Sequence, residues 1–324
     1  MRPAIVVALA LAAAGSELYS QSYGQPATPR IVGYVELALQ QGDLASAVAL
    51  VGQYRRLNGD TPEALEALSW VARGEIVAGN SSEAMRYAEE IMHVSQASLA
   101  TRKLDAEPHL PLAVGAAYEV EAEVLASRDK RTEALQLLRS GLHAWQGTSL
   151  VDRLQKNINL LTLQGRPMPV LRETEWIGTK PVAPNAWRGK VLLLFFWAHW
   201  CADCKAESPI ISQLAQQLEP KGLTVIAPTR LYGYTAEDEN ASPAKEKAFV
   251  SKVFEKYYAG IPNVQVPLDS GNFQHFGAST TPTIVLVDRH GTVQLYHPGV
   301  MTEADLRSAI ERLLAPANVA RHSS

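Results

Sequence analysis

The two cysteines of this chain stand three residues apart, in the sequence Cys201-Ala202-Asp203-Cys204. A hydrophobic run, 191–197, precedes them and predicts a buried strand, and the residues after them predict a helix. A thiol at a helix N-terminus meets unpaired backbone N–H groups and the positive end of the helix dipole, which lower its pKa. We expect Cys201 to attack a disulfide and Cys204, on the same helical face, to resolve the mixed disulfide.

Three other roles of this pair stay open on the sequence alone. A structural disulfide is one, although its loop is too short to restrict the unfolded chain much. A zinc site is another, but with no third cysteine its remaining ligands would be histidine or carboxylate side chains. The third is a pair of buried, inert thiols.

Length and composition indicate the number of domains and the classes of partner that the chain can bind. With 324 residues, of which 47% are hydrophobic, it is long enough for two domains with cores of their own. A formal net charge of −3 and 19% charged residues give no basic surplus. We therefore expect no nucleic-acid partner and no binding to anionic membranes.

The N-terminus reads as an export signal. Arg2 precedes an apolar run, 5–14, and small residues follow it. This run is too short for a membrane-spanning helix, which needs about 20 residues. We predict a cleaved signal peptide and the start of a linker over residues 1–22, and hence a periplasmic or extracytoplasmic, oxidising location. An uncleaved anchor or a buried N-terminal helix is the alternative.

Residues 30–164 carry apolar and small side chains at helical spacing, for example over 44–51. Two prolines, Pro167 and Pro169, follow this region, and proline does not continue a helix. We therefore predict a helical domain over 30–164.

A weak repeat runs through the helical half, in which a residue suited to a tight turn stands shortly before an alanine. The three copies are Gly42-Asp43 with Ala47, Gly79-Asn80 with Ala84, and Asp129 with Ala134. This pattern resembles tetratricopeptide-like helical hairpins, interrupted by an insertion around residues 108–111. The resemblance implies stacked hairpins with a possible protein partner in their groove; a packing domain without a ligand is equally open.

Beyond residue 165, hydrophobic strands alternate with amphipathic helices. The predicted strands are 191–197, 223–227, 283–288 and 292–296, and the predicted helices are 204–218, 243–258 and 302–314. This order predicts an α/β layer structure with a mixed sheet.

Two separated motifs in this half carry a more specific resemblance. They are the segment Trp200-Cys201-Ala202-Asp203-Cys204-Lys205 and the segment Phe276-Gly277-Ala278-Ser279-Thr280-Thr281-Pro282-Thr283. Both are similar to exported TlpA/ResA-like thiol-disulfide oxidoreductases of the thioredoxin fold. The resemblance implies that a thioredoxin-like mixed-sheet domain over 165–318 follows the helical-hairpin domain.

The same resemblance assigns roles in substrate binding. It implies that Pro282 is the family's cis-proline, facing the cysteines, and that the backbone of Thr281 pairs with an extended substrate peptide. An ordinary trans proline opening a strand is the alternative. Trp200 offers a flat apolar wall for the peptide, or simply packs against the sheet.

Proton transfer needs a separate candidate. Thioredoxin carries a buried aspartate six residues before its first cysteine, and this chain has Phe195 there. Glu207 matches a glutamate that tunes the cysteines in ResA-like proteins, so we expect it to accept the proton of Cys204. The alternative is a solvated carboxylate near a helix start.

Three further features bear on the site. The anionic Asp203 should raise the cysteine pKa and make the pair reducing. We expect His199 to be an exposed loop residue, and the segment 230–242 to be an insertion that shapes substrate access.

Together these observations predict an exported protein disulfide reductase. It would exchange its dithiol with protein thiols or disulfides, take electrons from an upstream dithiol donor, and need no bound cofactor or metal, since no nucleotide fingerprint is visible. The alternatives are a helical-repeat scaffold with a non-catalytic thioredoxin-like domain and, less favoured, a peroxidase.

Overall fold

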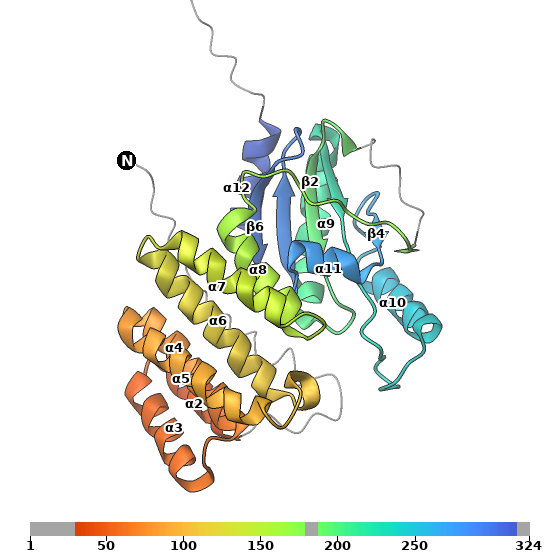
Figure 1. Ribbon diagram of the computed structural model, residues 1–324. Coiled ribbons are helices and arrows are strands. Elements are labelled where there is room, and N and C mark those ends of the chain that lie inside the picture. The colour runs from red at the N-terminus through yellow and green to blue at the C-terminus, as the bar shows by residue number, and fades with distance from the viewer. Residues whose placement is uncertain (1–29, 179–186, 316–324) are drawn as a thin grey trace, which may run out of the picture. The chain divides into compact units, whose positions relative to one another are not determined.

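The computed structural model describes residues 30–178 and 187–315 (Figure 1). The predicted signal peptide and the linker up to residue 29 lie outside these residues. The chain divides into two compact units after Ile158. We predicted the boundary at 164/165; the last turn of helix α8 (Leu150–Thr162) goes with the second unit because Leu160 and Leu163 pack into its core.

The first unit is helical. Its elements are α2 (Arg30–Gln40), α3 (Leu44–Asn58), α4 (Pro62–Val77), α5 (Ser81–Leu99), a short 3-10 turn (Leu104–Ala106), α6 (His109–Ser127), α7 (Arg131–Ala144) and most of α8. Helices adjacent in the chain pack as hairpins, α2 with α3, α4 with α5 and α6 with α7, and α4 also packs on α6. No described helix is long and apolar enough to cross a membrane.

The repeat read from the sequence marks three of these hairpins. Gly42, Gly79 and Asp129 all have a positive φ, of 75°, 80° and 59°, at the turns between helices. The alanines of the pattern, Ala47, Ala84 and Ala134, are fully buried. The predicted turns and close packing are therefore confirmed, whereas membership of the tetratricopeptide family stays a prediction.

The insertion predicted around residues 108–111 lies slightly earlier, in the connection of residues 100–108 between α5 and α6. Pro108 immediately precedes α6, and Pro111 lies in the first turn of that helix. Proline is tolerated there because the first N–H groups of a helix have no intrahelical partner.

Glu119 on α6 is a largely buried acidic residue of the helical unit, and its side chain is 11% exposed. Its carboxylate accepts hydrogen bonds from Arg153 Nη2 at 2.6 Å, Lys156 Nζ at 2.5 Å and Arg73 Nη2 at 3.1 Å. Burial by itself would raise the pKa of Glu119, but these cations hold it well below its usual value. Gly115 leaves room for this cluster, since a Cβ there would lie 2.8 Å from Arg153 Cδ.

We predict that Glu119→Ala lowers the free energy of unfolding by about 3–5 kcal/mol, because it leaves neighbouring buried cations without their counter-charge. Urea denaturation followed by far-UV circular dichroism measures the change. Glu83→Ala is the matched control, since Glu83 pairs with Arg86 on the surface and its loss should cost less than about 1 kcal/mol. Equal losses in the two variants would contradict the prediction.

The second unit is built on a mixed sheet. Its strands β2 (Val191–Phe196), β3 (Leu223–Ile226), β5 (Thr283–Val287) and β6 (Val293–Pro298) lie in the order β3-β2-β5-β6. β3 runs parallel to β2, whereas β5 runs antiparallel to both β2 and β6. The predicted mixed sheet is confirmed.

Strand β2 is buried on both faces. Alternate residues such as Leu193 and Phe195 pack in one core with helices α9 (Ala202–Leu218), α10 (Pro243–Tyr257) and α12 (Glu303–Leu314). The residues between them, such as Leu194 and Phe196, pack in a second core that includes α11 (Ser270–Phe276). Helices thus cover both faces of the sheet (Figure 1).

All of the strands and helices predicted beyond residue 165 are present, with ends that differ by one or two residues. Four short elements of the described residues beyond 165 escaped prediction: α11, a 3-10 helix (Glu219–Lys221), and the antiparallel pair β1 (Trp176–Ile177) with β4 (Val266–Pro267). Each is too short for hydrophobic periodicity to register.

Candidate active site

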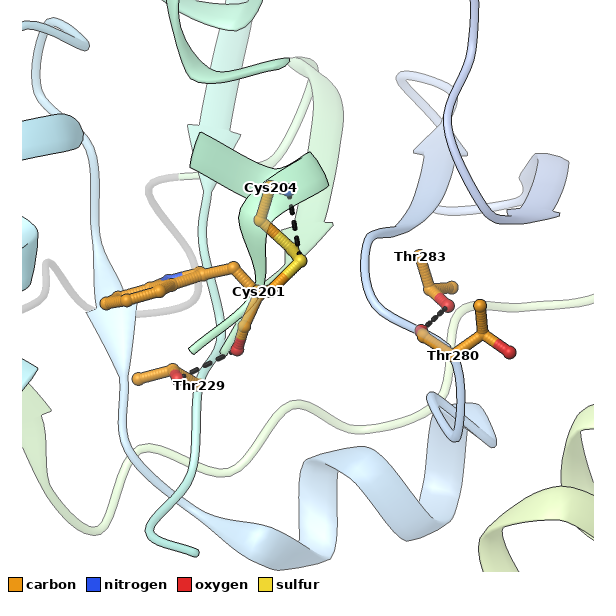
Figure 2. The surroundings of a disulfide bond; sticks show 6 residues. Cys201, Cys204, Thr229, Thr280 and Thr283 are labelled. Carbon is orange, nitrogen blue, oxygen red and sulfur yellow. Dashed lines mark hydrogen bonds between the residues drawn. A yellow bond between two sulfur atoms is a disulfide. The ribbon is translucent and has the colours of Figure 1, made fainter. Parts of the chain in front are cut away.

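The two cysteines occupy the turn between β2 and α9. Cys201 is the N-cap of α9 and forms a disulfide bond with Cys204 (Figure 2). The Sγ of Cys201 also accepts a hydrogen bond from the backbone N–H of Cys204, at 3.0 Å. The helix dipole and the N–H group of Cys204 therefore act on the sulfur of Cys201, as the sequence indicated.

Both cysteines are fully buried, with 0% of their surface exposed. They belong to the same hydrophobic core as Trp197 and Ile284. A sulfur atom with no exposed surface is out of reach of a second protein. A substrate can therefore meet Cys201 only if side chains around the disulfide move.

The segment before β5 lies at the same end of the sheet as the cysteines. Phe196 at the end of β2 is paired with Thr283 at the start of β5, so the residues just beyond them emerge together. The Thr281–Pro282 bond is cis, as the resemblance implied. The Thr283 hydroxyl donates a hydrogen bond to the Thr280 carbonyl at 2.6 Å, which holds the turn (Figure 2).

Besides the acidic group of Glu207, two polar groups at this end of the unit have no hydrogen-bond partner among the described residues. They are the indole N–H of Trp200 and the hydroxyl of Thr281, both buried. A buried polar group without a hydrogen bond is costly and needs an explanation. Trp200 is half-buried and packs against the core, so both of its predicted roles, packing and substrate contact, remain compatible with its position.

Glu207 lies one turn into α9 and is only 2% exposed, so the alternative of a solvated carboxylate is wrong. Its Oε1 accepts a hydrogen bond from the Met301 N–H at 3.1 Å, whereas its buried Oε2 has no partner. Burial raises the pKa of Glu207 to about 7; the Met301 bond opposes this rise and the charge of Asp203 adds to it. Such a carboxyl can gain or lose a proton near neutral pH.

The position of thioredoxin's buried aspartate is fully apolar in this chain. Phe195 is 0% exposed, and its ring lies 6.3 Å from that of Tyr258. Phe195 therefore supplies no base, and Glu207 is the ionisable side chain in the first turns of α9 with a pKa near neutrality.

The prediction that His199 is exposed is wrong. It is 2% exposed, and its Nε2 lies 3.2 Å from Oε1 of Glu246 on α10. Burial, with a smaller contribution from the charge of Lys205, lowers the pKa of His199 to about 4, so its ring is neutral at pH 7. Glu246 was not among the candidate residues. Its place on the same helical face as the buried Val250 and Val253 is the signal that could have indicated its burial.

Across residues 30–178 and 187–315, no group of three or more histidine, cysteine, aspartate or glutamate side chains could hold a metal ion.

Comparison with known proteins places this site in a family. Residues 163–313 match the family model described as Redoxin. The C-terminal unit is a Redoxin domain. ResA, a thiol-disulfide oxidoreductase of Geobacillus thermodenitrificans, is 25% identical over 127 residues, which are 39% of this chain and 65% of the relative. The thiol:disulfide interchange protein DsbE of Pseudomonas fluorescens is 26% identical over 147 residues, 45% of this chain and 72% of the relative.

A solved structure of a putative DsbE from Chlorobium tepidum is 25% identical and covers 47% of this chain and 98% of its own, with a TM-score of 0.37. This chain covers 65% of the length of ResA, which is slightly less than two thirds. The predicted resemblance is confirmed: the Redoxin domain, which contains the Cys201/Cys204 pair, is similar to the thiol-disulfide oxidoreductases ResA and DsbE.

The raised pKa of Glu207 predicts a pH-dependent stability. Between about pH 4.5 and 7 the unfolded chain loses this proton while the folded Redoxin domain keeps it, so stability falls as pH rises through that window. At about 1.4 kcal/mol per pKa unit, a rise from 4.5 to about 7 corresponds to an accumulated loss of about 3–4 kcal/mol. The substitution Glu207→Gln removes the titrating carboxyl and with it this loss of stability at high pH.

We therefore expect the oxidised Glu207→Gln protein to be more stable than the wild type at pH 8 but not at pH 4, in urea denaturation. Glu311→Gln is the control, because Glu311 is half exposed on α12 and should change little at either pH. The same difference between Glu207→Gln and wild type at both pH values would count against a raised pKa.

Proposed function

We propose that this chain is a protein disulfide reductase, in which Cys201 attacks and Cys204 resolves. The observation that carries the proposal is the disulfide at the start of α9, placed at the same end of the sheet as the cis Thr281–Pro282 bond in a Redoxin domain. This arrangement puts a redox-active pair beside a turn to which an extended peptide could add.

The exchange consumes one dithiol and produces one disulfide. The thiolate of Cys201 attacks one sulfur of a substrate disulfide, which forms a mixed disulfide and releases the other substrate sulfur as a thiolate. The thiolate of Cys204 then attacks the Sγ of Cys201, which closes the Cys201–Cys204 bond and releases the second substrate thiolate. Two electrons pass to the substrate, and an upstream dithiol donor must then reduce the Cys201–Cys204 disulfide before the next cycle.

Glu207 is the group we assign to proton transfer in the second step. Cys204 must lose its proton to attack, and a carboxyl with a pKa of about 7 is half ionised at neutral pH. Its Oε2 has no partner in the oxidised protein, so it is available to a proton. The Met301 N–H bond to the other oxygen fixes the orientation of the carboxyl.

The substrate peptide would lie between Trp200 and the Thr281–Pro282 turn. The backbone of Thr281 precedes β5, so an extended peptide would pair with it beyond the end of that strand. The unpaired indole N–H of Trp200 and the unpaired Thr281 hydroxyl could meet acceptors and donors of such a peptide.

Location and partners complete the proposal. We infer an extracytoplasmic protein from the apolar run near the N-terminus. The helical unit would contribute a protein-binding surface built from its stacked hairpins. No nucleic acid is expected as a partner, given the formal net charge of −3.

Trapping of the mixed disulfide tests the roles of the cysteines. Reduced Cys204→Ser protein, offered insulin as a disulfide-bonded probe, should accumulate a covalent adduct that mass spectrometry detects, because it attacks but does not resolve. Cys201→Ser is the matched control and should trap at least about tenfold less. Stronger capture by Cys201→Ser would reverse the two roles, and capture by neither would favour the binding scaffold.

The reduction potential tests the direction of electron flow. We expect a value near that of thioredoxin, about −270 mV, and far from about −120 mV, which would mark a disulfide donor. Equilibration with dithiothreitol, followed by the fluorescence of Trp200, measures it. Asp203→Asn should raise the potential by about 10–30 mV, because removing the anion stabilises the thiolate and hence the reduced state.

A further inference from the structure

The connection between β3 and α10 places aromatic side chains next to the cysteine motif. Tyr232 and Tyr234 belong to this connection, and their ring centroids lie 5.5 Å and 5.0 Å from that of His199. Tyr232 also lies 5.5 Å from the ring of Trp200, nearly edge to face. The residues that immediately precede Cys201 are therefore in direct contact with this segment.

A single buried carboxylate holds the segment in place. Oε1 of Glu246 accepts a hydrogen bond from the Tyr232 N–H at 2.5 Å, and its Oε2 accepts one from the Gly233 N–H at 2.7 Å. Gly233 has a φ of 86°, a left-handed conformation that glycine adopts without strain. Two successive N–H groups thus converge on one anion.

The same carboxylate connects the segment to the cysteine motif. His199 Nε2 lies 3.2 Å from Glu246 Oε1, and both side chains are 1% exposed. A buried carboxylate is tolerated only when hydrogen bonds replace its hydration, and these three contacts do so. They also fix the backbone of Tyr232 relative to His199, and hence relative to Trp200 and Cys201.

Tyr232 is held on a second side as well. The guanidinium of Arg230 lies 5.0 Å from the centroid of its ring and 4.7 Å from that of Phe273. Tyr232 and Trp200 are both half-buried, so each keeps part of its surface exposed. Together they form an apolar corner, which we define as the rings of Tyr232 and Trp200, beside the reacting disulfide.

We propose that this apolar corner selects substrate cysteines that have an aromatic or large aliphatic neighbour, and that Glu246 is the positioning residue that sets it. The proposal rests on the proposed function, because it concerns the substrate of the same disulfide. Once the side chains that bury the sulfurs have moved, two aromatic rings next to Cys201 gain contact area with an apolar side chain of the substrate. Glycine beside the substrate cysteine offers no such contact.

The test compares two disulfide-linked peptide dimers that differ only in the residue next to cysteine, phenylalanine or glycine. The second-order rate constant of the fully reduced chain is measured with each dimer and with oxidised glutathione. We expect the wild type to favour the phenylalanine dimer about fivefold to tenfold. Tyr232→Ala and Glu246→Gln should each reduce this ratio to less than about twofold, whatever their absolute rates.

Matched controls separate selection from folding. Tyr232→Phe keeps the ring and should keep the ratio. Glu237→Gln, an exposed carboxylate of the same segment, and Tyr34→Ala, an exposed tyrosine of α2, should also keep it. Because Glu246→Gln removes a buried anion, the folding of this variant is checked by circular dichroism. If Glu246→Gln is unfolded, the comparison of Tyr232→Ala with the wild type decides the test.

Each other outcome is decisive. A wild type that reduces both dimers at the same rate, or a Tyr232→Ala protein that keeps the wild-type ratio, would overturn the proposal. A Tyr232→Ala protein whose rate rises equally with all three disulfides would show that the ring only covers the cysteines, which also overturns it. A wild type that leaves all three disulfides unreduced would instead refute the proposed function.

Discussion

The double-sided burial of strand β2 is the constraint on which the rest of the Redoxin domain depends. Its residues from Val191 to Phe196 are buried on both faces, so the strand has no freedom to shift its register without moving two cores at once. Cys201 stands five residues after the end of this strand, and the Thr281–Pro282 turn immediately precedes the neighbouring strand β5. The position of the disulfide is therefore set by the packing of the sheet.

Two buried glutamates near this disulfide differ in how many hydrogen bonds their carboxyl oxygens accept, and this difference determines what each carboxyl can do. Glu246 has two backbone N–H groups and a histidine ring around it, so both of its oxygens are occupied and it serves to fix a backbone. Glu207 has one N–H group and an oxygen without a partner, and burial raises its pKa to about 7. Similar residues at similar depth are thus suited to holding structure in one case and to moving a proton in the other.

Local patterns predicted most of the long elements. The run 191–197, the alternation beyond residue 165 and the turn residues before Ala47, Ala84 and Ala134 each depend on neighbours within one or two turns of chain, which is why they could be read correctly. The misassigned features depend on distant partners. His199 is buried by residues of α10 and of the segment before it, and the short pair β1 and β4 exists because residues 89 and 91 positions apart meet.

The sequence by itself determined the chemistry: two cysteines at the spacing of a redox pair, a strand before them, a helix after them, and a proline that precedes β5. These follow from residue types and short periodicities. The tertiary structure alone decided that both sulfurs are fully buried, that Glu207 lacks one partner and that Glu246 ties Tyr232 to His199. Exposure and hydrogen bonding arise from chain segments brought together by folding, and no local pattern in the sequence records them.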